Sequence, residues 1–394
     1  MQAILEVKQL QEAVKQAGKF ATSKHMPILN TVRIEAGADG LTVTGTNLET
    51  WARSTVECVT QTDSGPSSVL VSASLLAKLA GKLGKGEVLL MAPKAVDGKS
   101  GVLTIGGAVI PTMEIEEYPE TPRTAAGVLV GSFPGAVFKD LVKRLKAASK
   151  TMSGGAATAY AAATGQFRRN LTGINTIYGA GRVKFAATDG HRLLLEEFDT
   201  DCNESGAVLV DAAELARIAT LVKASDVVTL EAIAGDPARL VVSFSSARYT
   251  LRDIPETFPD FERVIPKAHA VEFTVSRKSL LEAVRRGGIV ANPDSGAVTL
   301  SLTAGSSVLS MSSGCRDLGY YSESVRLGET VEDPGEPVSF NGSHIEDVLK
   351  GGKSLSVRVS LGGRLQAALF STDSDSVPGR TRQAWVLMPL NISQ

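Results

Sequence analysis

One short segment of the chain carries residue types that could do acid–base chemistry. Asp189-Gly190-His191-Arg192 places a carboxylate, an imidazole and a guanidinium close together, and a carboxylate beside an imidazole is a common apparatus for proton transfer. The same segment is also typical of a turn at a strand end, because Asp and Gly favour turn geometry. Both interpretations stay open: a hydrolase that uses Asp189 and His191, and a turn without a catalytic role.

Other catalytic and phosphate-binding patterns are weak or missing. Gly98-Lys99-Ser100 and Gly352-Lys353-Ser354 resemble the end of a phosphate-binding loop, but Pro93 and Asp347 stand where its first glycine belongs. The sequence contains no GxSxG, HExxH or GxGxxG pattern. The segment Asp189 to Arg192 is therefore the one cluster that could serve as acid–base apparatus.

The cysteines and histidines do not form a metal-binding pattern. Cys58, Cys202 and Cys315 stand far apart without a CxxC spacing, and the 4 histidines are scattered. A disulfide framework, a thiolate zinc site and a histidine metal cluster are therefore not expected. No apolar run approaches the roughly 18 residues of a membrane span, and the N-terminus lacks the regions of a signal peptide. These features predict a cytoplasmic protein with no membrane partner.

Positive charge is concentrated on the expected helices. Lys+Arg 41 nearly balance Asp+Glu 42, so only the placement of charge is informative. In the helix expected around 136–148, Lys139, Lys143, Lys146 and Lys150 follow one helical stripe opposite an apolar face. The helix expected around 74–84 sets Lys78, Lys82 and Lys85 opposite Leu75, Leu76, Leu79 and Leu83. Other expected helices carry Lys8, Lys15, Lys19, Lys278, Arg285, Arg286, Lys350 and Lys353.

Two interpretations of these stripes are open. A solvated helix face is often rich in lysine, which needs no functional explanation. However, acidic residues are scarce on the stripes, while Glu114, Glu116, Glu117 and Glu196 to Asp201 fall in expected strands and loops. This segregation favours a surface that binds phosphates. Since no aromatic residue interleaves the stripes, we expect contact with the nucleic-acid backbone and no dependence on sequence.

An internal repeat organises the chain. A strand, a short helix and a second strand are expected around 69–90, and the pattern returns around 208–230 and 338–357. A related strand–helix unit precedes each copy, around 5–17, 128–145 and 273–284. The chain therefore reads as three copies of a domain of about 130 residues, each built from two related halves.

Alternating apolar residues predict strands for most of the remainder. Leu355, Val357, Val359 and Leu361 alternate with polar residues, which is the period of a half-buried antiparallel strand. Proline-rich linkers lie at 118–122 and 255–266. We expect an α+β fold in which two short helices per copy pack on mostly antiparallel sheets.

The segment around Asp189 also carries a family resemblance. Phe185 to Leu193 contains Thr-Asp-Gly-His-Arg-Leu, which closely resembles a signature of the bacterial DNA sliding clamp, the beta subunit of DNA polymerase III. Further similarity lies in 26–30 with 41–49, in Phe258 to Pro266 and in Val386 to Leu390. These matches span almost the full length of the chain.

The resemblance implies a non-catalytic assembly that is not an enzyme and needs no cofactor. The family is a head-to-tail homodimer in which three clamp domains per chain make a six-domain ring, with sheets outside and helices lining a central hole. The domains would be 1–125, 126–265 and 266–394. The implied partners are double-stranded DNA, the DNA polymerase III alpha subunit, the clamp loader, and other DNA polymerases and repair proteins, with the protein cytoplasmic and nucleoid-associated.

The resemblance also implies three sets of functional residues. The pocket for partner peptides would comprise Leu171, Thr188, Gly190, His191, Arg192, Leu193, Pro259, Val264, Val386 and Met388. Residues facing DNA would be Lys8, Lys15, Lys19, Lys24, Lys78, Lys82, Lys85, Lys139, Lys143, Lys146, Lys150, Arg168, Arg169, Lys278, Arg285, Arg286 and Lys350. The dimer interface would include Leu103, Ile105, Ile289 and Val290.

Three hypotheses follow. The first is a sliding clamp that encircles duplex DNA and tethers the replicative polymerase. The second is a repeat-built hydrolase that uses Asp189 and His191. The third is a scaffold of clamp fold that binds proteins but encircles nothing.

Overall fold

The structure is a computed structural model that describes residues 1–61, 67–92, 101–122, 126–149, 169–372 and 377–391. The chain folds into two compact units, each described here by itself. Unit 1 comprises Met1–Ala136 and Arg217–Asp253, and unit 2 comprises Val137–Ala216 and Ile254–Gln394. The division into domains 1–125, 126–265 and 266–394 stays a prediction.

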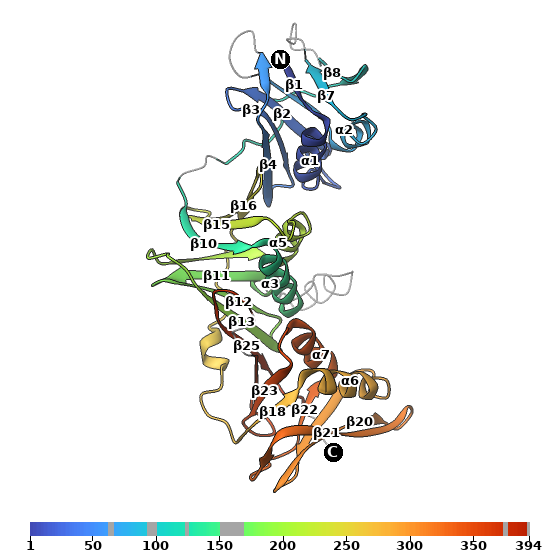
Figure 1. Ribbon diagram of the computed structural model, residues 1–394, viewed down its shortest axis with the longest axis vertical. Coiled ribbons are helices and arrows are strands. Elements are labelled where there is room, and N and C mark those ends of the chain that lie inside the picture. The colour runs from blue at the N-terminus through green and yellow to red at the C-terminus, as the bar shows by residue number, and fades with distance from the viewer. Residues whose placement is uncertain (62–66, 93–100, 123–125, 150–168, 373–376, 392–394) are drawn as a thin grey trace. The chain divides into compact units, whose positions relative to one another are not determined.

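The elements recur three times along the chain in one order (Figure 1). The first copy contains β1 (Gln2–Glu6), α1 (Val7–Gly18), the 3-10 helix η1 (Pro27–Asn30), β2 (Thr31–Gly37), β3 (Gly40–Thr46), β4 (Thr50–Val56), β5 (Val59–Gln61), β6 (Ser67–Ser72), α2 (Ala73–Ala80), β7 (Glu87–Met91), β8 (Val102–Ile105) and β9 (Ala108–Pro111). The second copy contains β10 (Val128–Pro134), α3 (Gly135–Ala148), η2 (Arg169–Thr172), β11 (Gly173–Gly179), β12 (Arg182–Thr188), β13 (Arg192–Asp199), β14 (Gly206–Asp211), α5 (Ala212–Ala219), β15 (Val227–Ile233), β16 (Arg239–Phe244) and β17 (Ala247–Arg252).

A linker with one 3-10 turn, η3 (Phe261–Val264), leads to the third copy. That copy contains β18 (Val271–Ser276), α6 (Arg277–Gly288), β19 (Ala297–Leu302), β20 (Ser306–Cys315), β21 (Gly319–Val331), β22 (Val338–Asn341), α7 (Gly342–Gly351), β23 (Ser356–Leu361), β24 (Ala368–Ser371) and β25 (Arg380–Leu387). The expected α+β fold with a threefold repeat is confirmed.

The sheets repeat one topology. The strand orders β4-β3-β2-β6, β13-β12-β11-β14 and β21-β20-β19-β22 place equivalent strands side by side in each copy. Every strand pair assigned among the described residues is antiparallel, for example β2 with β3 and β11 with β12. Each copy therefore contains three strands that pair in chain order as a meander, and a fourth strand that returns to pair with the first of them.

Strands from consecutive copies pair with each other at two equivalent junctions. In unit 1, β17 pairs with β4, with Tyr249 opposite Ala52. In unit 2, β25 pairs with β13, with Val386 opposite Leu193. Because these pairings extend a sheet across each junction, neither strand is left with a free edge there.

Polar caps fix where the second helix of each copy begins. The side chains of Ser72, Asp211 and Asn341 end β6, β14 and β22, and each accepts hydrogen bonds from backbone N–H groups in the first turn of α2, α5 or α7. Such caps satisfy donors that have no partner within the helix. The change from strand to helix is thus encoded at equivalent positions of the repeat.

The α1 helix packs closely on the sheet of unit 1. Leu10, Val14 and Ala17 are fully buried, which is the apolar stripe expected at helical spacing. The backbone of α1 approaches β3 so closely that a Cβ at Gly45 would lie 2.3 Å from the Ala17 carbonyl oxygen. Glycine at this position is required by the contact, because any side chain would push the helix off the sheet.

The α2 helix differs from its sequence-based prediction. It ends at Ala80, so Lys82 and Lys85 lie in the loop that follows and do not continue a helical stripe. Leu75, predicted to face the core, is 37% exposed and shares the outer face with Lys78. The cap at Ser72 sets the phase of the helix, and that phase buries Leu76 and Ala80 instead.

A buried charged cluster joins helix and sheet in unit 2. The Arg144 guanidinium of α3 donates to both carboxylate oxygens of Glu196 on β13, at 2.5 and 2.8 Å. Arg380 of β25 lies 3.7 Å from the same carboxylate, and Gln383 donates to it at 3.1 Å. Glu196 is fully buried, and burial lowers the pKa of Arg380 below its ordinary value.

We expect Glu196→Gln to lower the free energy of unfolding of unit 2 by about 3–5 kcal/mol, because it removes the carboxylate that neutralises the buried Arg144. Denaturant titration would measure the change. The control is Arg182→Ala, which breaks the exposed Arg182–Asp199 pair and should cost about 0–1 kcal/mol. Equal losses in the two variants would contradict the proposed importance of the buried cluster.

Candidate functional site

The segment Asp189 to Arg192 forms a tight turn between β12 and β13. One Asp189 carboxylate oxygen accepts the backbone N–H groups of His191 and Arg192, at 2.9 and 3.0 Å. The Thr188 hydroxyl donates to the Arg192 carbonyl and accepts the Gly190 N–H. Gly190 has φ of +95°, a conformation that glycine adopts without strain.

This geometry does not support the hydrolase hypothesis. Asp189 binds backbone N–H groups and the Arg192 side chain, so its carboxylate is not aligned on the His191 imidazole. A general base of this kind needs an orienting hydrogen bond and a nucleophile within reach. The segment acts as a structural turn.

The turn forms one wall of a cleft of about 180 Å³ in unit 2. All ten residues predicted for a partner pocket line it: Leu171, Thr188, Gly190, His191, Arg192, Leu193, Pro259, Val264, Val386 and Met388. Asp260 and Phe261 also line it and were not predicted. Both belong to the linker motif Phe258 to Phe261, so the proline-rich signal pointed to them without revealing which side chains turn inward.

The cleft is mainly apolar and has a rigid rim. Leu193, Phe261 and Val386 are buried in one hydrophobic cluster beneath it, whereas Met388 is 36% exposed. Arg192 donates to Asp189, Asp347 and the Ala147 carbonyl, at 3.0, 2.7 and 2.6 Å. Its guanidinium therefore braces the wall, and His191, which is exposed, is the rim residue free to contact a ligand.

A second histidine lies beside the rim. The rings of His191 and His344 are 6.4 Å apart between centroids. His344 belongs to the first turn of α7. Burial lowers its pKa below the ordinary value of 6.5, and the neighbouring Arg192 and His191 add to this effect, while Asp189 and Asp347 oppose it.

Most lysines of the first two copies are exposed on the surface. Lys8, Lys15, Lys19, Lys24, Lys78, Lys82, Lys85, Lys139 and Lys143 are exposed, and Lys146 is half-buried. Lys19 donates to the Thr220 hydroxyl. Lys150 and Arg168 lie outside the described residues, and Arg169 is half-buried in η2.

In the third copy, the expectation that acidic partners are scarce is wrong. Arg285 and Lys350 both pair with Glu346, at 3.4 and 2.6 Å. Arg286 pairs with Glu323 at 2.7 Å, and these hydrogen bonds raise the pKa of Arg286 and lower that of Glu323. Lys278 lies 4.0 Å from Glu282. Most of these acids come from another element packed against α6, which a stripe on a single helix does not reveal.

The two phosphate-loop candidates receive no support. Gly352-Lys353-Ser354 follows α7 and leads into a strand, whereas a phosphate loop must lead into a helix. Lys353 pairs with Asp140 at 2.5 Å. The segment Gly98-Lys99-Ser100 lies outside the described residues.

Two of the four predicted dimer-interface residues belong to the core. Leu103 and Ile105 on β8 are 0% and 1% exposed within a single chain, because they point to the inner face of their sheet. Their side chains cannot meet a second chain, so that prediction is wrong for them. Ile289 is 75% exposed after α6, and Val290 is half-buried, so both stay candidates.

The described residues hold neither a metal-binding cluster nor a membrane-spanning helix. They contain no group of three or more His, Cys, Asp or Glu that could hold a metal ion. They also contain no helix long and apolar enough to cross a membrane.

Comparisons with known proteins agree on one family. The profile of the DNA polymerase III beta subunit N-terminal domain matches residues 1–122, and that of its C-terminal domain matches residues 262–380. A beta sliding clamp from Synechocystis is 25% identical over 386 residues, covering 93% of each chain. One from Halalkalibacterium halodurans is 22% identical over 369 residues, covering 89% of this chain and 90% of its own.

Solved structures show the same fold. The DNA polymerase sliding clamp of Bacillus subtilis superimposes with a TM-score of 0.82 at 20% identity. A Pseudomonas aeruginosa sliding clamp bound to griselimycin gives 0.79 at 22% identity. Each comparison covers 100% of both chains.

The environment of His344 predicts a pH dependence of stability. Because the folded state lowers the pKa of His344, the unfolded state binds the proton more tightly. The folded state is therefore at its full stability with respect to this group above about pH 6.5, where His344 is neutral in both states. It loses stability as the pH falls through the folded pKa. His344→Gln should remove this component from the thermal midpoint of unit 2 measured against pH. The exposed His269 provides the control His269→Gln. Parallel curves for wild type and His344→Gln would refute the assignment.

Proposed function

The chain belongs to the DNA polymerase III beta subunit family, and from that premise we propose that two copies close head to tail into a six-domain ring around duplex DNA. The ring tethers the replicative polymerase and gives it processivity. Such a clamp is not an enzyme, because it acts by encircling DNA and tethering the polymerase. This is consistent with the structural role of the Asp189 turn.

The observation that carries the proposal is a pair of unmatched strand edges. The junctions β4·β17 and β13·β25 join equivalent strands of consecutive copies. In the remaining junction of this kind, the strand equivalent to β4 and β13 is β21, and the strand equivalent to β17 and β25 is β9. β9 pairs only with β8, and β21 from Gly319 to Arg326 pairs only with β20 among the described residues.

A second copy can satisfy both edges. If β9 of one chain pairs with β21 of the other, two such junctions form by symmetry and no edge of this type remains free. The exposed Val109 on β9 and Tyr320 on β21, at 63% and 82%, would lie close to each new junction. Ile289 is the remaining exposed apolar candidate for this interface.

The basic residues support sequence-independent binding of the DNA backbone. Exposed lysines on α1, α2 and α3 lie on the helices that the family places along the central hole. Contacts of this kind are weak individually and sensitive to salt, which suits a ring that must slide. The paired arginines of the third copy would contribute less positive potential.

The cleft bounded by Leu171, Leu193 and Val386 would receive short peptides of partner proteins. Its apolar floor suits hydrophobic anchors, and the exposed His191 suits a polar group at the peptide end. The partners we propose are the DNA polymerase III alpha subunit, the clamp loader, other DNA polymerases and repair proteins. We place this work in the cytoplasm, at the nucleoid.

Retention on DNA tests the ring. The protein is loaded on nicked circular plasmid by a clamp loader proven on a known clamp, half of the sample is linearised, and both halves are followed by gel filtration in high salt. Retention on circles and loss from linear ends is expected, because a closed ring escapes only over an end. Equal loss from both forms would favour the scaffold hypothesis.

Two variants separate the causes of retention. Charge reversal at Lys139, Lys143 and Lys146 should weaken salt-sensitive association with DNA while the protein stays dimeric, and a scaffold would be indifferent to it. Ile289→Asp should give monomers in sedimentation and abolish retention on circles. Retention by a monomeric protein would contradict the proposed topology.

Leu171→Asp tests the cleft separately. Because an unpaired carboxylate in an apolar site costs several kcal/mol, we expect the affinity for the polymerase of the same cell to fall by about a hundredfold or more. Retention on circular DNA should be unchanged. Surface plasmon resonance with immobilised polymerase would measure the loss.

The matched control is Leu365→Asp, since Leu365 is 62% exposed and is not one of the residues that line the cleft. Met388→Ala, at the exposed edge of the cleft, should cause a smaller loss. Equal affinities for wild type and Leu171→Asp would exclude the cleft as the polymerase site.

A further inference from the structure

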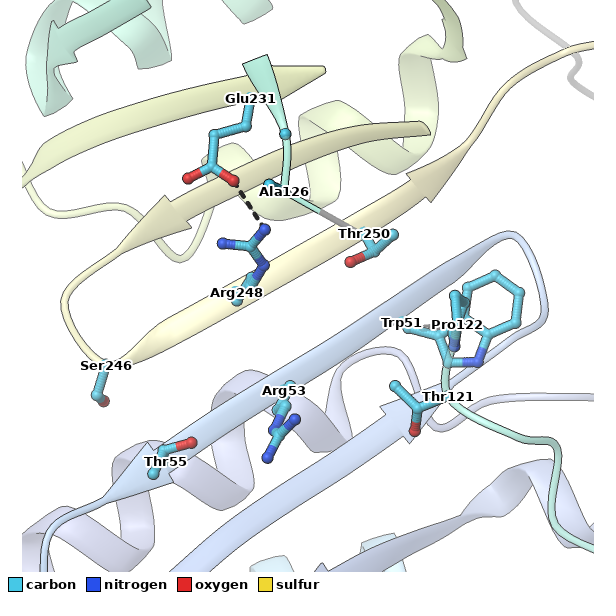
Figure 2. A pocket seen from close by; sticks show the side chains of 11 residues that line it. Trp51, Arg53, Thr55, Thr121, Pro122, Ala126, Glu231, Ser246, Arg248 and Thr250 are labelled. Carbon is cyan, nitrogen blue, oxygen red and sulfur yellow. Dashed lines mark hydrogen bonds and ion pairs between the residues drawn. The ribbon is translucent and has the colours of Figure 1, made fainter. Parts of the chain in front are cut away.

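Unit 1 contains a second cleft at the junction equivalent to that of the partner pocket. It has a volume of about 630 Å³ and lies on β4 and β17, with linker residues Thr121, Pro122, Ala126 and Gly127 along its side (Figure 2). Trp51, Arg53 and Thr55 of β4 reach it, whereas Ser54 donates a hydrogen bond to Gln16 of α1. Since strand side chains alternate, the cleft lies on the sheet face opposite α1 and its lysines.

The two junctions share a turn but differ in the chemistry beside it. The Asn47 side chain accepts the N–H groups of Glu49 and Thr50, and Thr46 bonds the backbone as Thr188 does. Leu48 has φ of +74°, where the other turn has Gly190. On this alignment, Trp51 and Arg53 stand where Leu193 and Leu195 lie in the apolar cluster of unit 2.

Two arginines face each other across the strands of this cleft. Arg53 of β4 is directly opposite Arg248 of β17, an arrangement of like charges that destabilises a sheet. Arg248 pairs with Glu231 at 2.7 Å, but Arg53 is exposed and makes no ion pair among the described residues. The cleft thus keeps one positive charge that the fold does not neutralise.

Two hydrogen-bond donors beneath the cleft surface also lack acceptors. The indole Nε1 of Trp51 and the Nε of Arg248 are inaccessible to solvent and have no partner among the described residues. A buried donor without an acceptor costs free energy. An anion bound beside Arg53 would relieve the charge repulsion across the strands, whereas these two donors lie beneath the surface and out of its reach.

The layout of the cleft narrows the class of ligand. Trp51 and Pro122 lie together at one end, Thr55 and Ser246 lie at the other, and the two arginines lie between them (Figure 2). A carboxylate can bind between the arginines while an adjoining apolar group packs on the indole ring. A cleft of this size accepts a chain segment and greatly exceeds the needs of one small anion.

We propose that this cleft binds an acidic peptide segment of a partner protein, with an Asp or Glu carboxylate held by Arg53 and Arg248 and an apolar neighbour packed on Trp51. The site is separate from the cleft of Leu171 and Met388 and does not depend on its function. It also lies on the sheet face away from the lysines of α1, so DNA is not its ligand. The first two copies would thereby offer a docking point at their own junction.

The two tryptophans of the chain provide a direct probe. Trp51 lines the cleft, whereas Trp385 is 1% exposed in unit 2. The full chain labelled with 5-fluorotryptophan should give two ¹⁹F resonances, assigned with Trp51→Phe. Blocked peptides with adjacent acidic residues and one leucine, such as Gly-Asp-Asp-Leu-Gly and Gly-Glu-Glu-Leu-Gly, are titrated against this sample.

We expect the acidic peptides to shift the Trp51 resonance saturably, and the matched Gly-Asn-Asn-Leu-Gly and Gly-Gln-Gln-Leu-Gly peptides to leave it in place. Arg53→Gln should lower the affinity for the acidic peptides by about tenfold, because it removes one charged hydrogen bond. The exposed Arg182→Gln serves as control and should bind normally. Arg53→Gln should also keep or raise the thermal midpoint of unit 1, because it removes a repulsion, so weaker binding cannot be ascribed to unfolding.

Several outcomes would overturn the proposal. These are no shift with any acidic peptide, an equal shift with the amide peptides, and unchanged affinity in Arg53→Gln. Inorganic phosphate and duplex DNA are titrated in parallel. A Trp51 shift with either of them but not with the peptides would assign the cleft to a different anion and refute peptide docking.

Discussion

Pairing between the edge strands of successive copies is the interaction on which this structure depends. A β-strand at a sheet edge exposes unpaired N–H and C=O groups, and each copy ends in such strands. The chain satisfies them by joining β17 to β4 and β25 to β13. The same constraint leaves an edge on β9 and an edge on β21 among the described residues, and the proposed ring pairs these two edges.

Strand alternation then divides the chemistry of each junction between two faces. In β4, Ala52 and Ser54 face α1, while Trp51 and Arg53 face the linker side. The lysines that contact DNA can therefore lie on helices at one face of the sheet, and clefts that bind protein segments can lie on the other face. The two equivalent junctions share one backbone arrangement but differ in side chains. The cleft is therefore apolar beside Leu193 and polar beside Arg53.

The same charged residue types serve distinct physical purposes here. Arg144 and Arg380 are buried against Glu196 and stabilise the packing of helix on sheet. Arg192 braces the wall of the apolar cleft through three hydrogen bonds. Arg53 is exposed and has no counter-charge among the described residues. Such an arginine opposite another arginine points to a ligand more strongly than an exposed lysine on a helix does.

The sequence by itself determined the threefold repeat and the α+β class, because periodicity is a local property of the chain. The family resemblance of its short motifs pointed to ten of the twelve residues that line the apolar cleft. The sequence did not reveal that Leu103 is core, that Leu75 faces outward, or that Glu346 and Glu323 neutralise the arginines of α6. Only the tertiary structure decided these points, since burial and ion pairing depend on which distant element packs against a residue. The cleft beside Trp51 likewise exists only where β4 meets β17.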